Sequence, residues 1–437
     1  MKRHASAVRT GKRLVLISVL ALSAFGLVMV YSAASVRDYQ VFGNSAYHLV
    51  RQAQWLLVGL CIMALAARLD LRLSDRRLPA HRDAAMVGWA VWGFSVAGLL
   101  AVAVSGVERY GATRWLQVGP FSLQPSEFAK LGCVMVTALM LTRWKRGALT
   151  GSELAASLVM TSLPVLALVL LQPDMGTAVS IAVGVFALLV LGGVDARALV
   201  GLAGTGAALG VVLATSADYR YERVLTYLDP WRDPSGAGYQ IIQSLLAFGS
   251  GGVGGVGLGL SRQKFFYLPM AHTDFIFAIV GEELGLIGAF CVVAAFAVFL
   301  VGGFMVAIGT RNEYDRLLAG GLTTLVGSQA VINMCAVTGL LPVTGIPLPF
   351  VSYGGSSLMF TLGCVGLVLG VARRAERSPE AVRSSARTAR RAAGSRAATH
   401  PMTMKGQLRE IPVERRRDRG ARLSRAGGRA HPRAGRA

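Results

Sequence analysis

The chain has 437 residues, of which 53% are hydrophobic and 16% charged, and its mean hydropathy is +0.52. These values exclude a soluble globular protein, because apolar runs of nearly twenty residues recur, and ~20 apolar residues cross a hydrocarbon core of ~30 Å. The formal net charge is +22, and most of it falls after residue 372, where 19 Lys and Arg stand against 5 Asp and Glu.

Ten apolar runs follow one another along the chain. In a bilayer every backbone polar group must be hydrogen-bonded within the protein, so these runs are expected to be helices. The sequence therefore predicts an all-α polytopic membrane protein with about ten transmembrane helices and a long loop, residues 216–274, between the seventh and the eighth. The eighth run is long enough to tilt or kink, and the five cysteines fall inside the runs, which predicts buried, reduced thiols. The runs are 14–34, 49–67, 84–104, 126–142, 153–171, 174–193, 198–215, 275–308, 316–340 and 350–372.

Basic residues gather in alternate loops and indicate the orientation. Residues 1–13 are basic, as are the loops 68–83, 143–152 and 309–316, whereas the intervening loops carry balanced charge or none. Positively charged loops stay in the cytoplasm, so both termini are predicted to be cytoplasmic and the loop 216–274 extracytoplasmic. The first run resembles a secretory signal, but it is longer than a signal core and further spans follow it, so we expect it to remain as the first span.

The basic tail, residues 373–437, is rich in Arg, Ala, Gly and Ser and has no apolar periodicity, which predicts disorder. A basic residue near anionic lipid contributes ~1 kcal/mol, which favours a tail at the cytoplasmic membrane surface; docking to a cytoplasmic partner is the alternative. Nucleic-acid binding is disfavoured, because no fold or aromatic platform accompanies the charge. The predicted parts are a cytoplasmic N-terminus (1–13), a membrane domain (14–372) and this tail.

The first polar segment with chemical potential, residues 114–130, leads into the fourth run. Pro125 and Glu127 are typical of the first turn of a helix. Lys130 lies three residues beyond Glu127 on the same face, and a lysine costs ~2.5–3.5 kcal/mol at mid-membrane unless it is paired or near a wet cavity. Glu127 and Lys130 are therefore either a functional or a structural pair. Arg114 is either an interfacial anchor or a ligand for phosphate groups.

Two further segments are predicted at the same membrane face. The turn 172–177 places Asp174 before the sixth run, where it is either a helix cap or a polar group lining a cavity. Residues 249–259 contain the spelling G-x-G-x-x-G, but no hydrophobic strand precedes them and no βαβ unit follows. A dinucleotide site is therefore rejected, and flexible or close-packed backbone is predicted instead.

The triplet His272-Thr273-Asp274 stands at the entrance of the eighth run. Asp274 is either a helix cap or a carboxylate whose pKa rises toward a value useful for proton abstraction. Glu282 and Glu283 follow about two and a half turns deeper, and at least one of them is expected to face the bundle interior.

Residues 347–357 combine prolines with paired glycines at the entrance of the last run. Irregular backbone at membrane depth is tolerated only where it is buried in protein or lines a water-filled cavity, and the hydroxyls of Ser352, Tyr353 and Ser356 would line such a cavity. The segments together predict an outward-facing polar pocket in an apolar bundle, suited to an enzyme or a transporter acting on an amphipathic, anionic, lipid-linked substrate. Expected near it are Arg114, Glu127, Lys130, Asp174 and Asp274.

These motifs resemble the SEDS family (shape, elongation, division and sporulation) of polytopic peptidoglycan polymerases. The resemblance covers about residues 14–372 and rests on the segments 114–130, 172–177, 238–244, 249–252, 267–288 and 349–357. The approach 264–269 and the length of the basic tail resemble the division member of the family more than the elongation member. One departure is Met270, where the family commonly has Glu or another polar residue; it puts activation or substrate contact in doubt and leaves Asp274 in place.

The resemblance implies glycan polymerisation outside the bacterial cytoplasmic membrane, at the division septum. The 4-hydroxyl of the GlcNAc in one lipid II attacks C1 of the lipid-linked MurNAc of a growing strand, the configuration inverts, and undecaprenyl diphosphate leaves. Asp274 corresponds to the family's essential aspartate and would be the general base, and Arg114 and Lys130 would offset charge on the diphosphate. Glu127 and Asp174 would orient these cations or hold a divalent ion (Mg²⁺ or Mn²⁺). The substrate-binding residues implied are Arg114, Glu127, Lys130, Asp174, Gln240, Gln243, His272, Thr273, Ser352 and Ser356.

The resemblance also implies a partner, a class B penicillin-binding protein that crosslinks the strands, and other cell-division proteins. Two alternatives from other functional classes stay open. A lipid II flippase would use the same bundle and cavity without bond chemistry, and a non-catalytic scaffold of the division machinery is the interpretation to which Met270 lends weight.

Overall fold

The computed structural model describes residues 2–71, 84–109, 112–118, 121–216 and 218–377. Each of the ten predicted runs is helical, and within these ranges eight helices are long and apolar enough to cross a membrane; α4 and α7 account for the other two runs. The tail was predicted to be disordered from residue 373, but residues 373–377 continue α12; the rest, from 378 onward, lies outside the described residues. The ten helices are α1 (Lys2–Phe42), α2 (Tyr47–Ala66), α3 (Ala84–Ser105), α4 (Pro125–Lys145), α5 (Gly151–Leu171), α6 (Met175–Gly192), α7 (Ala196–Thr215), α10 (Ile276–Gly309), α11 (Glu313–Val337) and α12 (Gly355–Arg377).

Local sequence signals set several helix boundaries. Thr150 and Glu153 form a capping box at the start of α5, in which each side chain accepts a hydrogen bond from the other residue's amide. The Asn312 side chain accepts a bond from the amide of Asp315 and so caps α11. Gly193, with φ 73°, ends α6 in the left-handed conformation that glycine adopts without strain. These boundaries follow from the chain's own residues.

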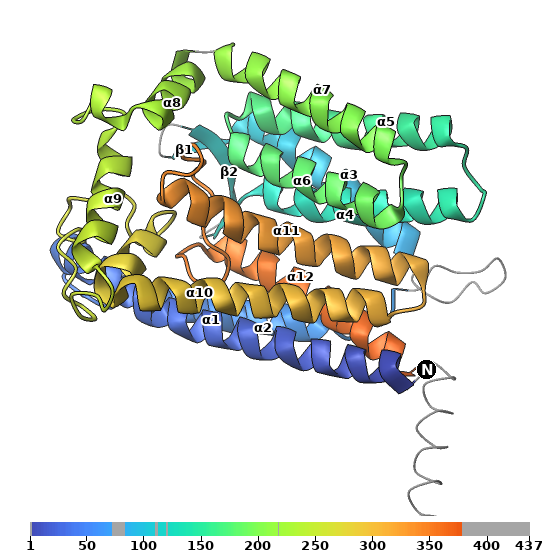
Figure 1. The fold of residues 1–437 in the computed structure, drawn as a ribbon, viewed down its shortest axis with the longest axis horizontal. Coiled ribbons are helices and arrows are strands. Elements are labelled where there is room, and N and C mark those ends of the chain that lie inside the picture. The colour runs from blue at the N-terminus through green and yellow to red at the C-terminus, as the bar shows by residue number, and fades with distance from the viewer. Residues whose placement is uncertain (1, 72–83, 110–111, 119–120, 217, 378–437) are drawn as a thin grey trace, which may run out of the picture. The chain divides into compact units, whose positions relative to one another are not determined.

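Helix α11 occupies the interior of the bundle, with α10 on one side and α4 and α6 on the other (Figure 1). Helix α1 packs along α10, and a Cβ atom on Gly11 would lie 2.6 Å from the Gly302 carbonyl oxygen. Such small residues allow membrane helices to approach closely. Lys12 of α1 and Glu376 of α12 form an ion pair at 3.0 Å. The start of the first span and the end of the last therefore lie at the same end of the bundle, as an even number of crossings requires.

A small antiparallel sheet, which the sequence did not predict, precedes α4. It consists of β1 (Val107–Arg109), β2 (Ala112–Val118) and β3 (Phe121–Leu123), in that order, with Leu116 opposite Leu123. Strand β2 packs against α3 and α4. The segment expected to be a loop is thus ordered, and it holds Arg114 in a strand beside the start of α4.

Helix α10 is broken near its start, as its length allowed. Gly285 has φ 64° and ψ −162°, a conformation almost restricted to glycine. The freed backbone groups pair with the glycine-rich loop: the amides of Val256 and Gly257 donate to the carbonyls of Glu282 and Glu283 at 3.0 Å each, and two amides beyond the break donate back to the loop. Because no backbone group at this depth can stay unpaired, the loop is close-packed backbone.

The long loop 216–274 contains three helical segments, α8 (Asp218–Leu228), η1 (Pro230–Arg232) and α9 (Tyr239–Gly251), which lie at the end of the bundle where α10 begins (Figure 1). The cysteine prediction was half right. All five thiols are free, and Cys133 and Cys364 are buried, but Cys61 and Cys291 are exposed. A residue inside a span can face lipid as readily as the core, so position within an apolar run did not determine burial.

Candidate active site

The segment between α11 and α12, residues 338–354, lies against His272 and Asp274: the Tyr353 amide donates to the His272 carbonyl at 3.0 Å, and Gly345 faces the Asp274 carboxylate. The segment is irregular, as its prolines and glycines predicted. Its fold is held from within and from α2, because the Ser352 hydroxyl accepts a bond from the Leu348 amide at 2.8 Å and Gln52 donates to the Ser352 carbonyl at 3.0 Å. The Ser356 hydroxyl donates to the Ser122 carbonyl at 2.7 Å. Two of the three predicted cavity hydroxyls, those of Ser352 and Ser356, therefore bind backbone groups in this structure.

Asp274 lies just before α10 and is not its cap. The capping position belongs to Phe275, which makes no side-chain capping bond. The carboxylate is half-buried and accepts one bond from a side chain, that of Thr273, at 2.9 Å. Burial raises the pKa of Asp274 above its usual 3.8, and the Thr273 hydroxyl and the charge of Arg223 oppose this only in part. Gly345 lies against this carboxylate, since a Cβ there would be 4.0 Å from Asp274 Oδ2.

Glu127 and Lys130 form a buried pair at 2.9 Å, with Lys130 only 1% exposed. Lys130 also donates to Gln329 Oε1 of α11 at 3.0 Å, and Gln329 in turn donates to the Pro347 carbonyl at 3.1 Å. The second carboxylate oxygen of Glu127 is buried and has no hydrogen-bond partner among the described residues. The cation is therefore connected to the 338–354 segment through one amide, which sequence reasoning missed.

Arg114 and Asp174 meet at the turn between α5 and α6. The Arg114 guanidinium donates to the carbonyls of Gln172 (3.2 Å) and Pro173, and it lies 3.8 Å from Asp174 Oδ1. Asp174 caps α6, as one interpretation of the sequence predicted, by accepting from the Thr177 amide at 3.2 Å. The turn also lies against the 338–354 segment, because a Cβ on the residue after Met175, a glycine, would contact Ile346 and Thr344. The helix-cap interpretation of Asp174 is therefore confirmed, and the side chain is buried beside Arg114.

His272 is buried against a histidine that the sequence analysis missed. The His48 ring lies 4.8 Å from the His272 ring and 4.5 Å from that of Tyr353, and its Nδ1 contacts the buried Asp38. Burial, with smaller contributions from the charges of His48 and Arg37, lowers the pKa of His272 to about 3. A neutral His272 supplies no positive charge to a substrate. The available signal was an acid and a histidine on either side of the turn after the first run.

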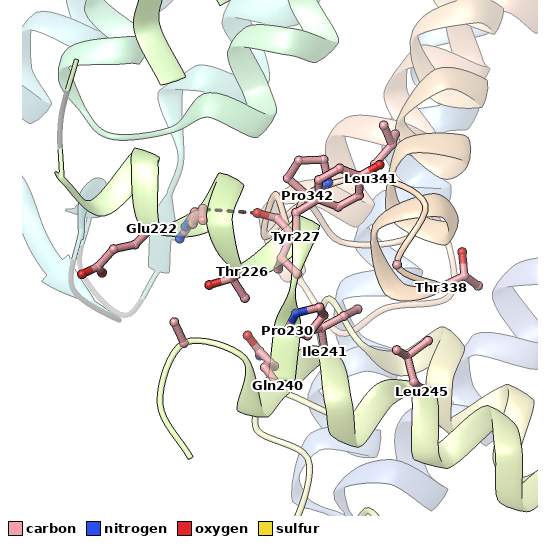
Figure 2. Close-up of a pocket in the computed structure, with 14 residues that line it drawn as sticks. Glu222, Thr226, Tyr227, Pro230, Gln240, Ile241, Leu245, Thr338, Leu341 and Pro342 are labelled. Atoms are coloured by element: carbon pink, nitrogen blue, oxygen red, sulfur yellow. Dashed lines mark hydrogen bonds between the residues drawn. The ribbon is translucent and has the colours of Figure 1, made fainter. Parts of the chain in front are cut away.

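Gln240 lies on the wall of a pocket of about 480 Å³ between α8, α9 and the 338–354 segment (Figure 2). Its side chain donates to the Pro269 carbonyl at 3.3 Å. Arg223, whose charge acts on Asp274, is on another wall and donates to the Val343 carbonyl at 3.3 Å. Gln243 is half-buried and does not line this pocket. Asp274 itself does not line this pocket, and Arg223 is the lining residue whose charge acts on its carboxylate.

The predicted polar residues are brought to one end of the bundle, but as separate pairs linked by the 338–354 segment. No hydrogen bond or ion pair joins Asp274 directly to Lys130 or Arg114 within the described ranges. In the same ranges no group of three or more His, Cys, Asp and Glu side chains is placed to hold a metal ion. A carboxylate of raised pKa can act as a proton acceptor, with cations held nearby.

The fold and the site define a multi-pass helical membrane protein with a polar centre at one end of the bundle. The chain belongs to the cell cycle protein family of FtsW, RodA and SpoVE, which residues 12–377 match. It is 40% identical to a probable peptidoglycan glycosyltransferase FtsW of Geobacter metallireducens, over 84% of this chain and 95% of that protein.

Two solved structures are similar. One, described as "Structural coordination of polymerization and crosslinking by a peptidoglycan synthase complex", has a TM-score of 0.67 and 34% identity and covers 84% of this chain and 98% of that one. The crystal structure of the rod shape determining protein RodA of Thermus thermophilus has a TM-score of 0.58 and 31% identity, over 83% and 96%.

Proposed function

We propose that this protein is a peptidoglycan glycosyltransferase that polymerises lipid II into glycan strands at the outer face of the cytoplasmic membrane during septal wall synthesis. The observation that carries the assignment is Asp274, a carboxylate of raised pKa that accepts one side-chain bond within the described residues and is acted on by the charge of Arg223, a residue of the pocket wall. The name of the Geobacter relative, a probable peptidoglycan glycosyltransferase, supports the reaction, and the family description, cell cycle protein, supports its place in division.

The chemistry assigns one proton and one leaving group. Asp274 takes the proton of the attacking 4-hydroxyl as that oxygen bonds to C1 of the donor sugar, and the bond from C1 to the diphosphate breaks on the opposite face, which inverts the configuration. A positioned general base typically contributes ~10²–10⁴-fold to the rate. A raised pKa suits this role, because the base must hold the proton it accepts.

The two cations Lys130 and Arg114 differ in how well they can bind the departing diphosphate. Lys130 is 1% exposed and its charge is balanced by Glu127, whereas the Arg114 side chain is 18% exposed and is bound mainly by neutral carbonyls. Arg114 is therefore the residue we assign to the diphosphate oxygens, and Lys130 stabilises the surrounding structure.

Several features of the assembled system belong to this proposal. The side with α8 and α9 is extracytoplasmic and both termini are cytoplasmic, by the distribution of basic loops. A class B penicillin-binding protein crosslinks the strands, and the similar synthase complex, which coordinates polymerisation with crosslinking, supports such a pairing. Asp174 or Glu127 would hold a divalent cation, which would supply positive charge to the departing diphosphate.

The test is polymerisation of fluorescent lipid II by the purified full-length protein, with and without its cognate transpeptidase, wild type beside Asp274→Ala. Wild type is expected to give glycan ladders, and Asp274→Ala to give none at equal folded protein. Ladders of wild-type intensity from Asp274→Ala would refute the base assignment. Absence of ladders from the wild type with the partner present, together with lipid II translocation in vesicles, would replace the enzyme by a flippase, and absence of both would indicate a scaffold.

A further inference from the structure

Two amide side chains of the largely apolar helix α11 are buried in the interior of the bundle. Gln329 and Asn333 are four residues apart and therefore on one helix face, and each is only 2% exposed. A buried amide without partners costs several kcal/mol in a hydrocarbon environment. Their presence therefore calls for specific bonds, which the amino groups of both make, while Asn333 Oδ1 is buried without a partner among the described residues.

Each amide holds one of two consecutive carbonyls in the 338–354 segment. Asn333 Nδ2 donates to the Ile346 carbonyl at 2.7 Å, and Gln329 Nε2 donates to the Pro347 carbonyl at 3.1 Å. Each amide also makes a second bond, one to the backbone of a charged residue and the other to the side chain of a charged residue. Asn333 Nδ2 also donates to the Asp274 backbone carbonyl at 2.7 Å, and Gln329 Oε1 accepts from Lys130 at 3.0 Å.

We propose that Asn333 is a positioning residue for Asp274, while Gln329 attaches the structural Glu127–Lys130 pair to the same helix. Both amides project from one helix, on which four residues span about 6 Å along the axis. Helix α11 therefore sets the spacing between the Asp274 carboxylate and the buried Glu127–Lys130 ion pair. This inference rests on the proposed function for its activity readout only.

Asp274 depends on such a bond because the backbone around it is irregular. It precedes α10, whose first residue is Ile276, and Met270 upstream has φ 56°, in the left-handed region that non-glycine residues seldom adopt. Within the described residues, the bond from Asn333 is the hydrogen bond that connects the Asp274 carbonyl to a spanning helix. A misplacement of ~1 Å in a reacting group can cost ~10²-fold in rate.

The experiment compares three variants in the full-length protein with its partner. Asn333→Leu keeps the side-chain volume, buries no charge and removes both bonds. Asn333→Gln keeps the donor group and displaces it by one methylene. Thr323→Val is the matched control, because Thr323 is fully buried on the same helix and its hydroxyl has no partner in the described chain. The readouts are kcat and KM for lipid II, the Tm, and amide hydrogen exchange of residues 270–276.

The expected result is a kcat ~10²-fold lower for Asn333→Leu at little changed KM, an intermediate kcat for Asn333→Gln, and wild-type values for Thr323→Val. Exchange at 270–276 should quicken in Asn333→Leu and not in the control. A kcat for Asn333→Leu equal to that of Thr323→Val, or unchanged exchange at 270–276, would overturn the inference. An inactive wild type would instead count against the proposed function, and the exchange comparison would still decide the positioning role.

Discussion

Asp274 and the pair Glu282–Glu283 lie within ten residues of each other and have opposite surroundings. Glu282 accepts from the Ser261 hydroxyl and from the Arg262 amide at 2.9 Å. Glu283 accepts from the Ser32 hydroxyl at 2.7 Å and the Ser261 amide at 3.3 Å, and Lys264 Nζ is 3.8 Å away. Asp274 accepts from one hydroxyl, and its pKa is raised by burial.

The difference separates a structural carboxylate from a reactive one. A carboxylate whose oxygens already accept bonds from several donors has little acceptor capacity left for a substrate group. Glu282 and Glu283 therefore anchor the residues 261–264 to the broken start of α10. Asp274 keeps acceptor capacity free at the cost of a destabilised charge, which is the usual condition of a group poised for proton transfer.

The largest expected effect comes from replacing each carboxylate by its amide and comparing activity with stability. Asp274→Asn should reduce polymerisation by ~10²–10⁴-fold, yet its Tm should equal or exceed that of the wild type, because the substitution removes a buried charge of raised pKa. Glu283→Gln should do the reverse: it should cost about 1–3 kcal/mol of unfolding free energy by weakening the bonds of Ser32 and Ser261, and retain kcat in the folded fraction. Ladder assays and thermal unfolding of the same preparations measure both.

That pair of variants also defines the contrary outcome. If Glu283→Gln lost kcat at unchanged Tm, the deeper carboxylate would be part of the chemistry. If Asp274→Asn lowered the Tm by as much as Glu283→Gln, Asp274 would be a structural residue, and the contrast between the two carboxylates would disappear.

Gly285→Ala tests the anchor through its backbone and should be the next largest effect. The residue's φ and ψ are almost exclusive to glycine, and a Cβ there would lie 2.4 Å from the Gly255 amide nitrogen. Strain alone costs about 1–3 kcal/mol, so a clear fall in Tm is expected. Gly254→Ala is the matched control, since a Cβ at that position of the same loop meets nothing within 4 Å. Equal Tm values for the two variants would show that the loop does not brace the break.

The helices could be predicted from the sequence because the bilayer imposes one solution on an apolar run of sufficient length. The strands β1 and β3 were missed because three residues carry no usable periodicity, and the seven-residue β2, which holds Arg114, was missed because its polar and apolar side chains do not alternate. Ser352 and Ser356 were placed by composition in a cavity, but hydroxyls bind the nearest unpaired backbone group, and irregular segments offer many.

The links between site residues were the part that sequence could not supply. In the sequence, Gln329 and Asn333 are two amides in an apolar run and were not singled out. Their role depends on which carbonyls the packed bundle places against α11. Likewise His48 gains its importance from stacking on His272, more than 200 residues away. Asp274 looked like a helix cap by spacing, and the helix begins two residues later.

The smallest expected effect is a displacement of the acidic limb of the pH–rate profile. Asp274 must be ionised to accept a proton, so the rate should fall as the pH decreases through its raised pKa, above the usual 3.8. The Thr273 hydroxyl favours the ionised form and opposes the increase, so Thr273→Val should move the limb to still higher pH. The nearby Arg223 stays charged throughout, and His272, with a pKa of about 3, stays neutral.

Because protonation of a group with a raised pKa favours the folded state, stability from Asp274 is present at low pH and is lost as the pH rises through that pKa. Profiles of kcat/KM and Tm against pH should therefore change in opposite directions, and a limb that Thr273→Val leaves in place would assign it to another group.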